Sequence, residues 1–253
     1  MTDVFRSSFS RQLVAVAIRK SGFSRLKART RVVRKPEDYE ARVRDFQREI
    51  IEHKRKGRPI VFVDETGFDE RASPLKGYAK KGSRLYISST SGSWTRVSVA
   101  AAISEDGAVM TTLQNGSFSS TSFSKFLGDL NLPQGTVVLM DNVAFHKSRT
   151  VQHVIDYKGW SSVFTPPYSP WFNPIENVFG IVQNHFRRLR VEDSDVKDER
   201  VSSIPLTSSM RMSKQIQDAF DTAASTCKVA NCVRRFWRFV SEKDIKDTLV
   251  TPR

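Results

Sequence analysis

The chain has 253 residues, 39% of them hydrophobic, which is enough for one sizeable core with a smaller appendage. Its 41 lysines and arginines outnumber its 27 aspartates and glutamates, and a net charge of +14 points to a polyanionic partner, most commonly nucleic acid. Two cysteines exclude a disulfide framework or a typical zinc site, and no apolar run suits a signal peptide or a membrane span, so we expect a soluble, intracellular protein.

Positive charge is concentrated in residues 1–59, which contain 17 lysines and arginines against 7 aspartates and glutamates. Ser10 is placed to cap a helix that runs to about Lys20, Gly22 then stops it, and a second helix is predicted at about 37–54. The charged stretch between them reads as a linker. This pattern fits a basic tail and a helix-turn-helix remnant with a DNA-tracking linker equally well. The linker residues predicted to contact DNA are Arg25, Lys27, Arg29, Arg31, Arg34 and Lys35.

Three further arginines are candidate DNA contacts. Arg58 lies in a Lys-Gly-Arg-Pro segment that resembles a minor-groove hook. Glycine and proline directly before a predicted strand also commonly form the turn that leads into it, and we favour that interpretation. Arg187 and Arg188 lie near the C-terminal end of a later predicted helix, where cations also suit the helix dipole.

From Ile60 onward the sequence has the pattern of a layered α/β domain. Two apolar runs, 60–63 and 136–140, do not alternate with polar residues and are each followed by an aspartate, which predicts strands buried on both faces. The predicted elements are strands at 60–63, 96–103 and 108–113, a helix at 120–130, a strand at 136–140, a helix at 148–157, a strand at 162–165 and a helix from Asn173 to about Arg190. This order predicts an α/β fold with a mixed β-sheet flanked by helices.

The C-terminal part is predicted to be a polar loop at 191–208 followed by helices at 210–226 and 229–240. We therefore divide the chain into three parts. Residues 1–58 form a basic, DNA-binding arm, residues 59–190 the α/β domain, and residues 191–253 the polar loop and C-terminal helices.

Asp64 and Asp141 each follow a predicted buried strand. If the strands are neighbours, the two carboxylates lie side by side at the sheet edge, where ligands of open α/β sheets gather. Adjacent carboxylates repel each other, and a hard divalent cation such as Mg²⁺ or Mn²⁺ would hold them together. Either aspartate taken alone is more simply explained as a strand exit.

Glu176 stands in the first turn of the helix that Asn173 is predicted to cap and Pro174 to begin. A glutamate at this position is usually part of a capping box. The fixed helix start and the open space that Gly180 leaves one turn later favour a ligand-binding role for the carboxylate. The sequence therefore offers both interpretations.

Asn142 and His146 follow Asp141 closely enough to line the same cleft, although a polar loop with a satisfied histidine is an equal alternative. Strand alternation places Glu65 on the opposite face from Asp64. We therefore expect Glu65 and its neighbours Asp69 and Glu70 to surround the site or lie on the surface.

Three motifs together resemble the mariner superfamily of DDE transposases. They are Val63 to Phe68 (VDETGF), Met140 to Asn142 with His146, and Tyr168 to Asn177 (YSPWFNPIEN). Between Asp141 and Glu176 lie 34 residues, a spacing found in that superfamily, and the resemblance covers about 60–190.

The resemblance implies an RNase H-like fold and a catalytic triad of Asp64, Asp141 and Glu176 that binds two Mg²⁺ or Mn²⁺ ions per active site. It implies cut-and-paste transposition, in which one centre cuts the transposon ends and joins them to target DNA. The implied partners are double-stranded DNA and a second copy of the chain in a DNA synapse, with no membrane and no small-molecule substrate. The compartment would be the nucleus in a eukaryote and the cytoplasm in a bacterium.

Two departures from the superfamily pattern bear on function. Residues 10–24 resemble only the last helix of the superfamily's second helix-turn-helix, so we expect an N-terminally truncated chain with altered recognition of transposon ends. Trp171 and Phe172 replace the commoner Asp-Leu. The alternatives are an inactive transposase-derived protein that binds DNA or dimerises, and another RNase H-like nuclease such as a junction resolvase, against which the proline loop argues.

Overall fold

A computed structural model describes residues 11–22, 37–69, 95–195, 208–226 and 228–241. The chain divides into two compact units, 1–35 and 36–253, and each is described by itself. In the first unit the described helix is α1 (Arg11–Lys20), which Gly22 follows with a φ of +80°, as the sequence predicted. The basic linker at 25–35, with its six predicted DNA contacts, lies outside the described residues.

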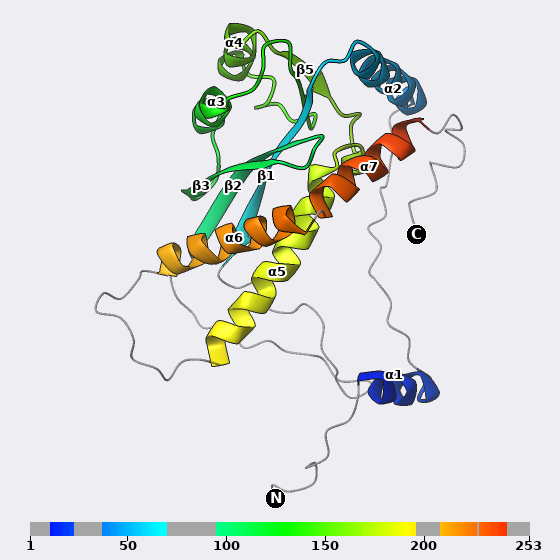
Figure 1. Ribbon diagram of the computed structural model, residues 1–253, viewed down its shortest axis with the longest axis vertical. Coiled ribbons are helices and arrows are strands. Elements are labelled where there is room, and N and C mark those ends of the chain that lie inside the picture. The colour runs from blue at the N-terminus through cyan, green and yellow to red at the C-terminus, as the bar shows by residue number, and fades with distance from the viewer. Residues whose placement is uncertain (1–10, 23–36, 70–94, 196–207, 227, 242–253) are drawn as a thin grey trace, which may run out of the picture. The chain divides into compact units, whose positions relative to one another are not determined.

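The second unit is built on a five-stranded mixed sheet with the strand order β3-β2-β1-β4-β5 (Figure 1). The strands are β1 (Ile60–Asp69), β2 (Arg96–Ser104), β3 (Val109–Asn115), β4 (Val137–Met140) and β5 (Ser161–Phe164). The first three pair antiparallel, whereas β4 pairs parallel with both β1 and β5. The mixed sheet and all five of its strands were predicted from the sequence.

The central strand is longer than predicted. The sequence predicted a strand ending at Val63, but β1 continues to Asp69 because β2 pairs with it as far as Asp69↔Arg96. On the other edge, β4 pairs with residues 60–62 of β1. Asp64 therefore lies inside a strand, just past the end of the parallel pairing, and is not a strand terminus as predicted.

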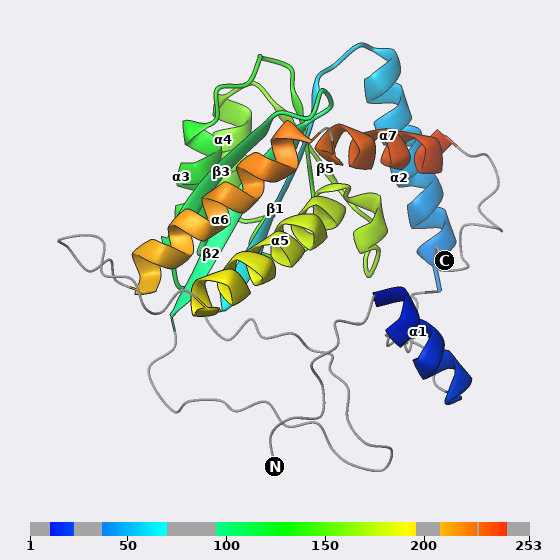
Figure 2. The same ribbon diagram turned by 60° about the horizontal axis from the view of Figure 1, so that its bottom comes forward.

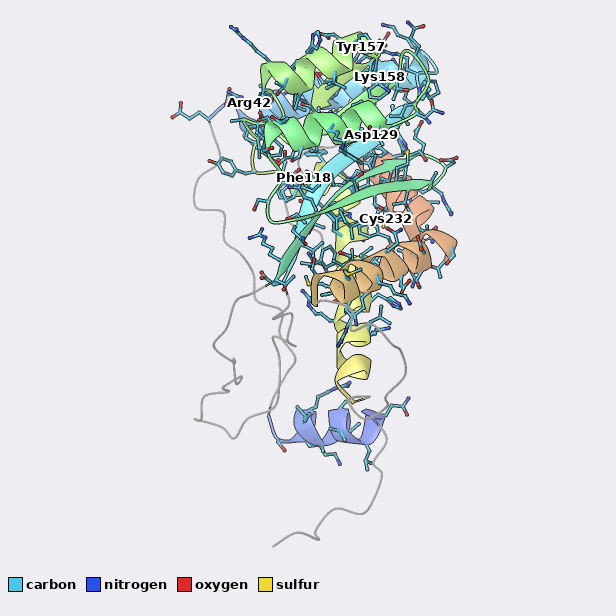
Figure 3. All side chains as sticks on the ribbon, turned by 90° about the vertical axis from the view of Figure 1, so that its left-hand side faces the viewer. Arg42, Phe118, Asp129, Tyr157, Lys158 and Cys232 are labelled. Carbon is cyan, nitrogen blue, oxygen red and sulfur yellow. The ribbon has the colours of Figure 1, made fainter. Side chains whose placement is uncertain are left out.

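Helices cover both faces of this sheet (Figures 2 and 3). One face carries α3 (Ser120–Asp129) and α4 (Arg149–Tyr157), and the other carries α2 (Tyr39–Arg55), α5 (Ile175–Asp195), α6 (Ser208–Ser225) and α7 (Lys228–Ser241). Alternation along β1 sends Val61 and Val63 into the core with α3 and α4, and Ile60 and Phe62 into the core with the other helices. No described helix is both long and apolar enough to cross a bilayer.

Two predicted boundaries differ from the structure. The sequence grouped α2 with the N-terminal arm because its composition is basic, but Val43, Phe46 and Ile50 are buried and α2 belongs to the second unit. Helix α5 continues to Asp195, past its predicted end near Arg190, and the rest of the predicted polar loop, 196–207, lies outside the described residues. Helices α6 and α7 contribute to the same core as the sheet and do not form a separate tail.

Arg58 ties the end of α2 to the starts of two strands. Its guanidinium donates to the carbonyl of Gly135 at 2.7 Å and to the hydroxyl of Ser161 at 2.8 Å, and Nη1 lies 3.1 Å from Nδ1 of His53. A guanidinium committed to three internal partners has a structural role. These contacts favour the strand-entry interpretation of the Lys-Gly-Arg-Pro segment, so we do not retain Arg58 among the proposed DNA contacts.

We expect Arg58→Ala to lower the free energy of unfolding by about 2 to 3 kcal/mol, because charged hydrogen bonds to three internal groups are lost. Urea denaturation followed by circular dichroism measures this change. The control is Arg42→Ala, which removes an exposed arginine paired with Asp38 and should cost less than about 1 kcal/mol. A loss no larger than the control's, accompanied by weaker DNA binding, would return Arg58 to the DNA contacts.

Candidate metal-binding active site

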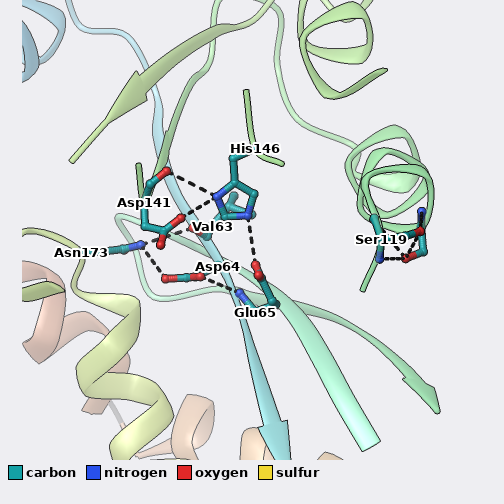
Figure 4. Close-up of polar contacts among 8 residues, drawn as sticks. Val63, Asp64, Glu65, Ser119, Asp141, His146 and Asn173 are labelled. Carbon is teal, nitrogen blue, oxygen red and sulfur yellow. Dashed lines mark hydrogen bonds and ion pairs between the residues drawn. The ribbon is translucent and has the colours of Figure 1, made fainter. Parts of the chain in front are cut away.

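Strands β1 and β4 bring two aspartates to the same place. Phe62 pairs with Leu139, so two residues further along these parallel strands Asp64 and Asp141 stand side by side. Ligand atoms of both aspartates and of His146 lie within 4.8 Å of one another (Figure 4). Asp64 is 7% exposed, whereas the Asp141 side chain is 36% exposed, so the pair has one buried and one accessible member.

Two donors fix the buried carboxylate of Asp64. Its Oδ1 accepts a hydrogen bond from the backbone N–H of Glu65 at 2.8 Å. Its Oδ2 accepts one from Nδ2 of Asn173 at 3.4 Å, and the same amide lies 3.3 Å from the carbonyl oxygen of Val63. Asn173 thereby ties the start of α5 to β1 (Figure 4).

The proline-rich loop before α5 is anchored in the core. The Tyr39 hydroxyl of α2 lies 2.7 Å from Oγ of Ser169, and the Ser169 hydroxyl in turn donates to the carbonyl of Pro167 at 3.1 Å. The 3-10 turn η1 (Pro170–Phe172) follows, and the centroid of the Phe172 ring lies 5.2 Å from that of the Phe46 ring. These contacts position the chain immediately ahead of Asn173.

Asn173 caps α5 in a way that leaves Glu176 outside a capping box. Its Oδ1 accepts a hydrogen bond from the Ile175 N–H at 3.4 Å. The backbone N–H of Asn173, which a capping-box glutamate would accept, donates instead to the carbonyl of Pro170 at 3.0 Å. The side chain of Glu176 is exposed. Of the two interpretations of Glu176, the geometry favours the one in which its carboxylate is available to a ligand.

The surroundings of Glu176 are open. A Cβ placed on Gly180, one turn later in α5, would meet no atom within 4 Å, which matches the space predicted there. Asn142 is half-buried beside Asp141. Glu176 is not a member of the close group formed by Asp64, Asp141 and His146, but its charge acts on Asp64.

His146 connects the two faces of the sheet at the open edge of β1. It is fully buried, with Nδ1 2.7 Å from Oδ1 of Asp141 and Nε2 3.0 Å from Oε2 of Glu65. Its ring packs 4.5 Å from that of Phe123 on α3. Nδ1 also lies 3.4 Å from the backbone carbonyl oxygen of Asp141, so the imidazole contacts both the side chain and the backbone of that residue (Figure 4).

The contact of Glu65 with His146 was not predicted from the sequence. Alternation on β1 turns it away from Asp64, as predicted, and the packing of His146 against α3 places the imidazole on that same face. Since β4 pairs only with residues 60–62, the edge of β1 beyond them is open to a side chain that reaches both carboxylates. Predicting the contact between Glu65 and His146 would have required knowing how many residues of β1 pair with β4.

The electrostatics of the cluster follow from its burial and its like charges. Burial raises the pKa of Asp64 to about 8, and the charges of Asp141, Glu65 and Glu176 contribute. Although Glu176 as a residue is exposed, its carboxyl group is partly desolvated by its surroundings, which raises its pKa, and the charges of Asp141 and Glu65 contribute. Burial alone would lower the pKa of His146, but its contacts with Asp141 and Glu65 raise it to about 9. Within the described part of the chain, the ion pairs of these carboxylates involve only His146.

The two arginines predicted near the end of α5 differ in exposure. Arg187 is half-buried and donates to Oδ1 of Asn184 at 3.2 Å and to Oε1 of Gln183 at 3.5 Å. Arg188 is exposed. Arg188 therefore has the freer guanidinium for an external partner.

Comparisons with known proteins agree with this arrangement. The family model described as DDE superfamily endonuclease matches residues 59–197. The fold is similar to that of the Mos1 strand transfer complex, with a TM-score of 0.56 and 16% identity over 91% of this chain and 69% of the other. It is also similar to the Mos1 transposase paired-end complex with left transposon end, with a TM-score of 0.50 and 15% identity over 90% of this chain and 70% of the other. No curated protein matches the sequence. The predicted RNase H-like fold is confirmed by the mixed sheet and its similarity to the Mos1 structures.

Proposed function

The chain belongs to the family of DDE superfamily endonucleases, and from this we propose that it is a DNA transposase whose metal-binding catalytic residues are Asp64, Asp141 and Glu176. The observation that carries the proposal is the pairing of β1 with β4, which sets two aspartates side by side, one of them tethered to the helix that carries Glu176. The fold shared with Mos1 transposase supports the same reaction class.

The residues of the site fit a divalent metal ion. Three carboxylates provide hard oxygen ligands of the kind that Mg²⁺ and Mn²⁺ prefer. The raised pKa of Asp64 reflects uncompensated negative charge in a buried place, which a divalent cation would neutralise. We propose that Asp64, Asp141 and Glu176 hold two such ions. When bound, the ions activate the attacking water or 3′-hydroxyl and stabilise the leaving oxygen during in-line displacement.

The other residues of the site orient the ligands. Asn173 and the Glu65 N–H each engage one oxygen of Asp64 and restrict its rotation. His146, held between Asp141 and Glu65, engages Oδ1 of Asp141 and leaves Oδ2 for a ligand. The two aspartates thus meet a ligand in a fixed orientation, which lowers the cost of organising the site for the reaction.

The proposed substrates are the two transposon ends and a target duplex, brought together by a homodimer. The net charge of +14 supports a polyanionic substrate. Arg188, with Arg187 beside it on α5, is a proposed contact with the DNA backbone, as are the six basic residues of the linker at 25–35.

The proposal is tested by incubating the full chain with supercoiled plasmid in Mg²⁺, in Mn²⁺ or in EDTA, and separating nicked from intact DNA. We expect nicking in either metal and none in EDTA. Nicking in EDTA, with contaminating nuclease excluded by an Asp141→Asn preparation, would refute the metal-dependent mechanism. Salt-dependent DNA binding without cleavage in any metal would favour an inactive DNA-binding protein instead.

A further inference from the structure

The solvent-facing side of α7 contains cations and no acid. Its exposed residues, which we call the α7 basic face, are Lys228, Asn231, Arg234, Arg235, Arg238 and Ser241. At 3.6 residues per turn they cover an arc of about 140° on one side of the helix. The whole exposed side of this 14-residue helix is therefore basic or small and polar.

The opposite side of α7 is fixed in the core, so the direction of the basic face is fixed as well. Val229, Val233, Phe236 and Val240 are buried, and the ring of Phe236 lies 5.0 Å from that of Phe62 on β1. Helix α7 packs against α2 and α5 on the same side of the sheet and crosses α2 at a steep angle (Figure 2). A rotation that hid the arginines would expose this apolar side.

The cations of this face differ from those of the neighbouring helix. On α2, Arg42, Arg44 and Arg48 are each paired with an acid one turn or less away. Among the residues that the structure describes, no acid forms an ion pair with Arg234, Arg235 or Arg238. Arginines that have no acidic partner within the described residues are suited to an external anion.

The spacing of the face suits a nucleic-acid backbone. From Lys228 to Arg238 the helix rises about 15 Å, and one DNA strand presents a phosphate about every 3.4 Å along the axis. The four cations therefore span about four phosphates. A membrane surface does not fit, because an interfacial helix inserts its apolar side, and that side of α7 is buried in the core.

We propose that the α7 basic face is a second DNA-binding surface, at which Arg234, Arg235 and Arg238 contact backbone phosphates. The inference rests on the proposed function, which supplies DNA as the substrate. Contacts of this type bind without regard to base sequence and hold the duplex in place while the acidic site acts on it.

The test compares two triple variants of the full chain that lose the same formal charge. One is Arg234→Gln with Arg235→Gln and Arg238→Gln, and the control is Arg42→Gln with Arg44→Gln and Arg48→Gln. Binding to a duplex of arbitrary sequence is measured by fluorescence anisotropy in EDTA, between about 50 and 200 mM salt. Circular dichroism verifies that both variants fold, as exposed positions should allow.

We expect the slope of log affinity against log salt to become shallower by about 2 to 3 in the α7 variant, at about 0.9 per lost phosphate contact. In the α2 control it should change by less than about 1. Equal changes in both variants, or an unchanged slope in the α7 variant, would overturn the inference, the second outcome indicating a protein partner for the face. The binding assay is run in EDTA and does not depend on cleavage. If the wild-type chain fails to nick plasmid with metal present but the two variants show the expected difference in binding, the result would count against the proposed function and leave this inference standing.

Discussion

Asp141→Asn is expected to reduce metal-dependent DNA nicking by at least about 100-fold, because loss of a group that merely orients a metal ligand already costs 10- to 100-fold. Asparagine keeps the shape of the side chain but removes the charge that would bind the cation. The rate is measured as the initial rate of plasmid nicking in Mn²⁺ and in Mg²⁺. DNA binding in EDTA should be retained, since the change affects chemistry rather than the backbone contacts.

The matched control is Asp156→Asn, the same substitution at an exposed position of α4. It should nick DNA at the wild-type rate. Glu176→Gln should behave like Asp141→Asn, because we assign both carboxylates to the metal site. A Glu176→Gln protein with full activity would remove the glutamate from the proposed triad and leave His146 as the third member of the group that the structure brings together.

Asp64→Asn is expected to stabilise the metal-free protein. With its pKa raised to about 8, Asp64 retains a proton in the folded chain that the unfolded chain releases near pH 4. At pH 7 this difference disfavours folding by about 4 kcal/mol. Asparagine avoids that cost but loses about 1 to 2 kcal/mol, because its single amide oxygen cannot accept from both Asn173 and the Glu65 N–H. The expected net gain is about 2 to 3 kcal/mol in EDTA.

The gain should depend on pH in a defined way. Between about pH 4 and pH 8 the folded wild type binds one proton more than the unfolded chain at Asp64, so its stability falls as pH rises through that window. His146 acts in the same direction at higher pH, its contribution being complete below 6.5 and lost as pH rises through about 9. The difference in stability between Asp64→Asn and wild type should therefore be small at pH 4 to 5 and largest near pH 8.

Thermal denaturation across this pH range, with and without Mn²⁺, measures both effects. Wild type should gain stability from Mn²⁺, most strongly near pH 8, whereas Asp64→Asn should gain little because one ligand is missing. If the variant is less stable than wild type in EDTA at pH 8, then the buried carboxylate of Asp64 does not destabilise the metal-free fold as its raised pKa indicates.

Much of this arrangement was predictable because its signals are local. Unalternating apolar runs predicted β1 and β4, and Asn173 with Pro174 predicted the start of α5. A motif resemblance pointed to the three carboxylates. Each of these signals lies within a few residues of the feature that it predicts.

The features that the sequence missed depend on pairing between distant segments. The extension of β1 past Asp64 comes from β2, whose partner residues lie 27 to 35 positions away in the sequence, from Glu65↔Ala100 to Asp69↔Arg96. The contact between Glu65 and His146 requires knowing that β4 stops early, and the burial of α2 requires knowing what covers its apolar side. A basic composition concealed that apolar side, because charge and helical periodicity are independent properties of the same residues.

The location of Asp141 has a consequence for how such chains persist. It stands just past a four-residue strand, more than a third of its side chain is exposed, and the core on either face of the sheet is made without it. Under the proposed function, a copy of the gene that loses this one carboxylate is therefore expected to produce a folded protein that still binds the same DNA. Such a protein would compete with active copies of the enzyme for the same DNA.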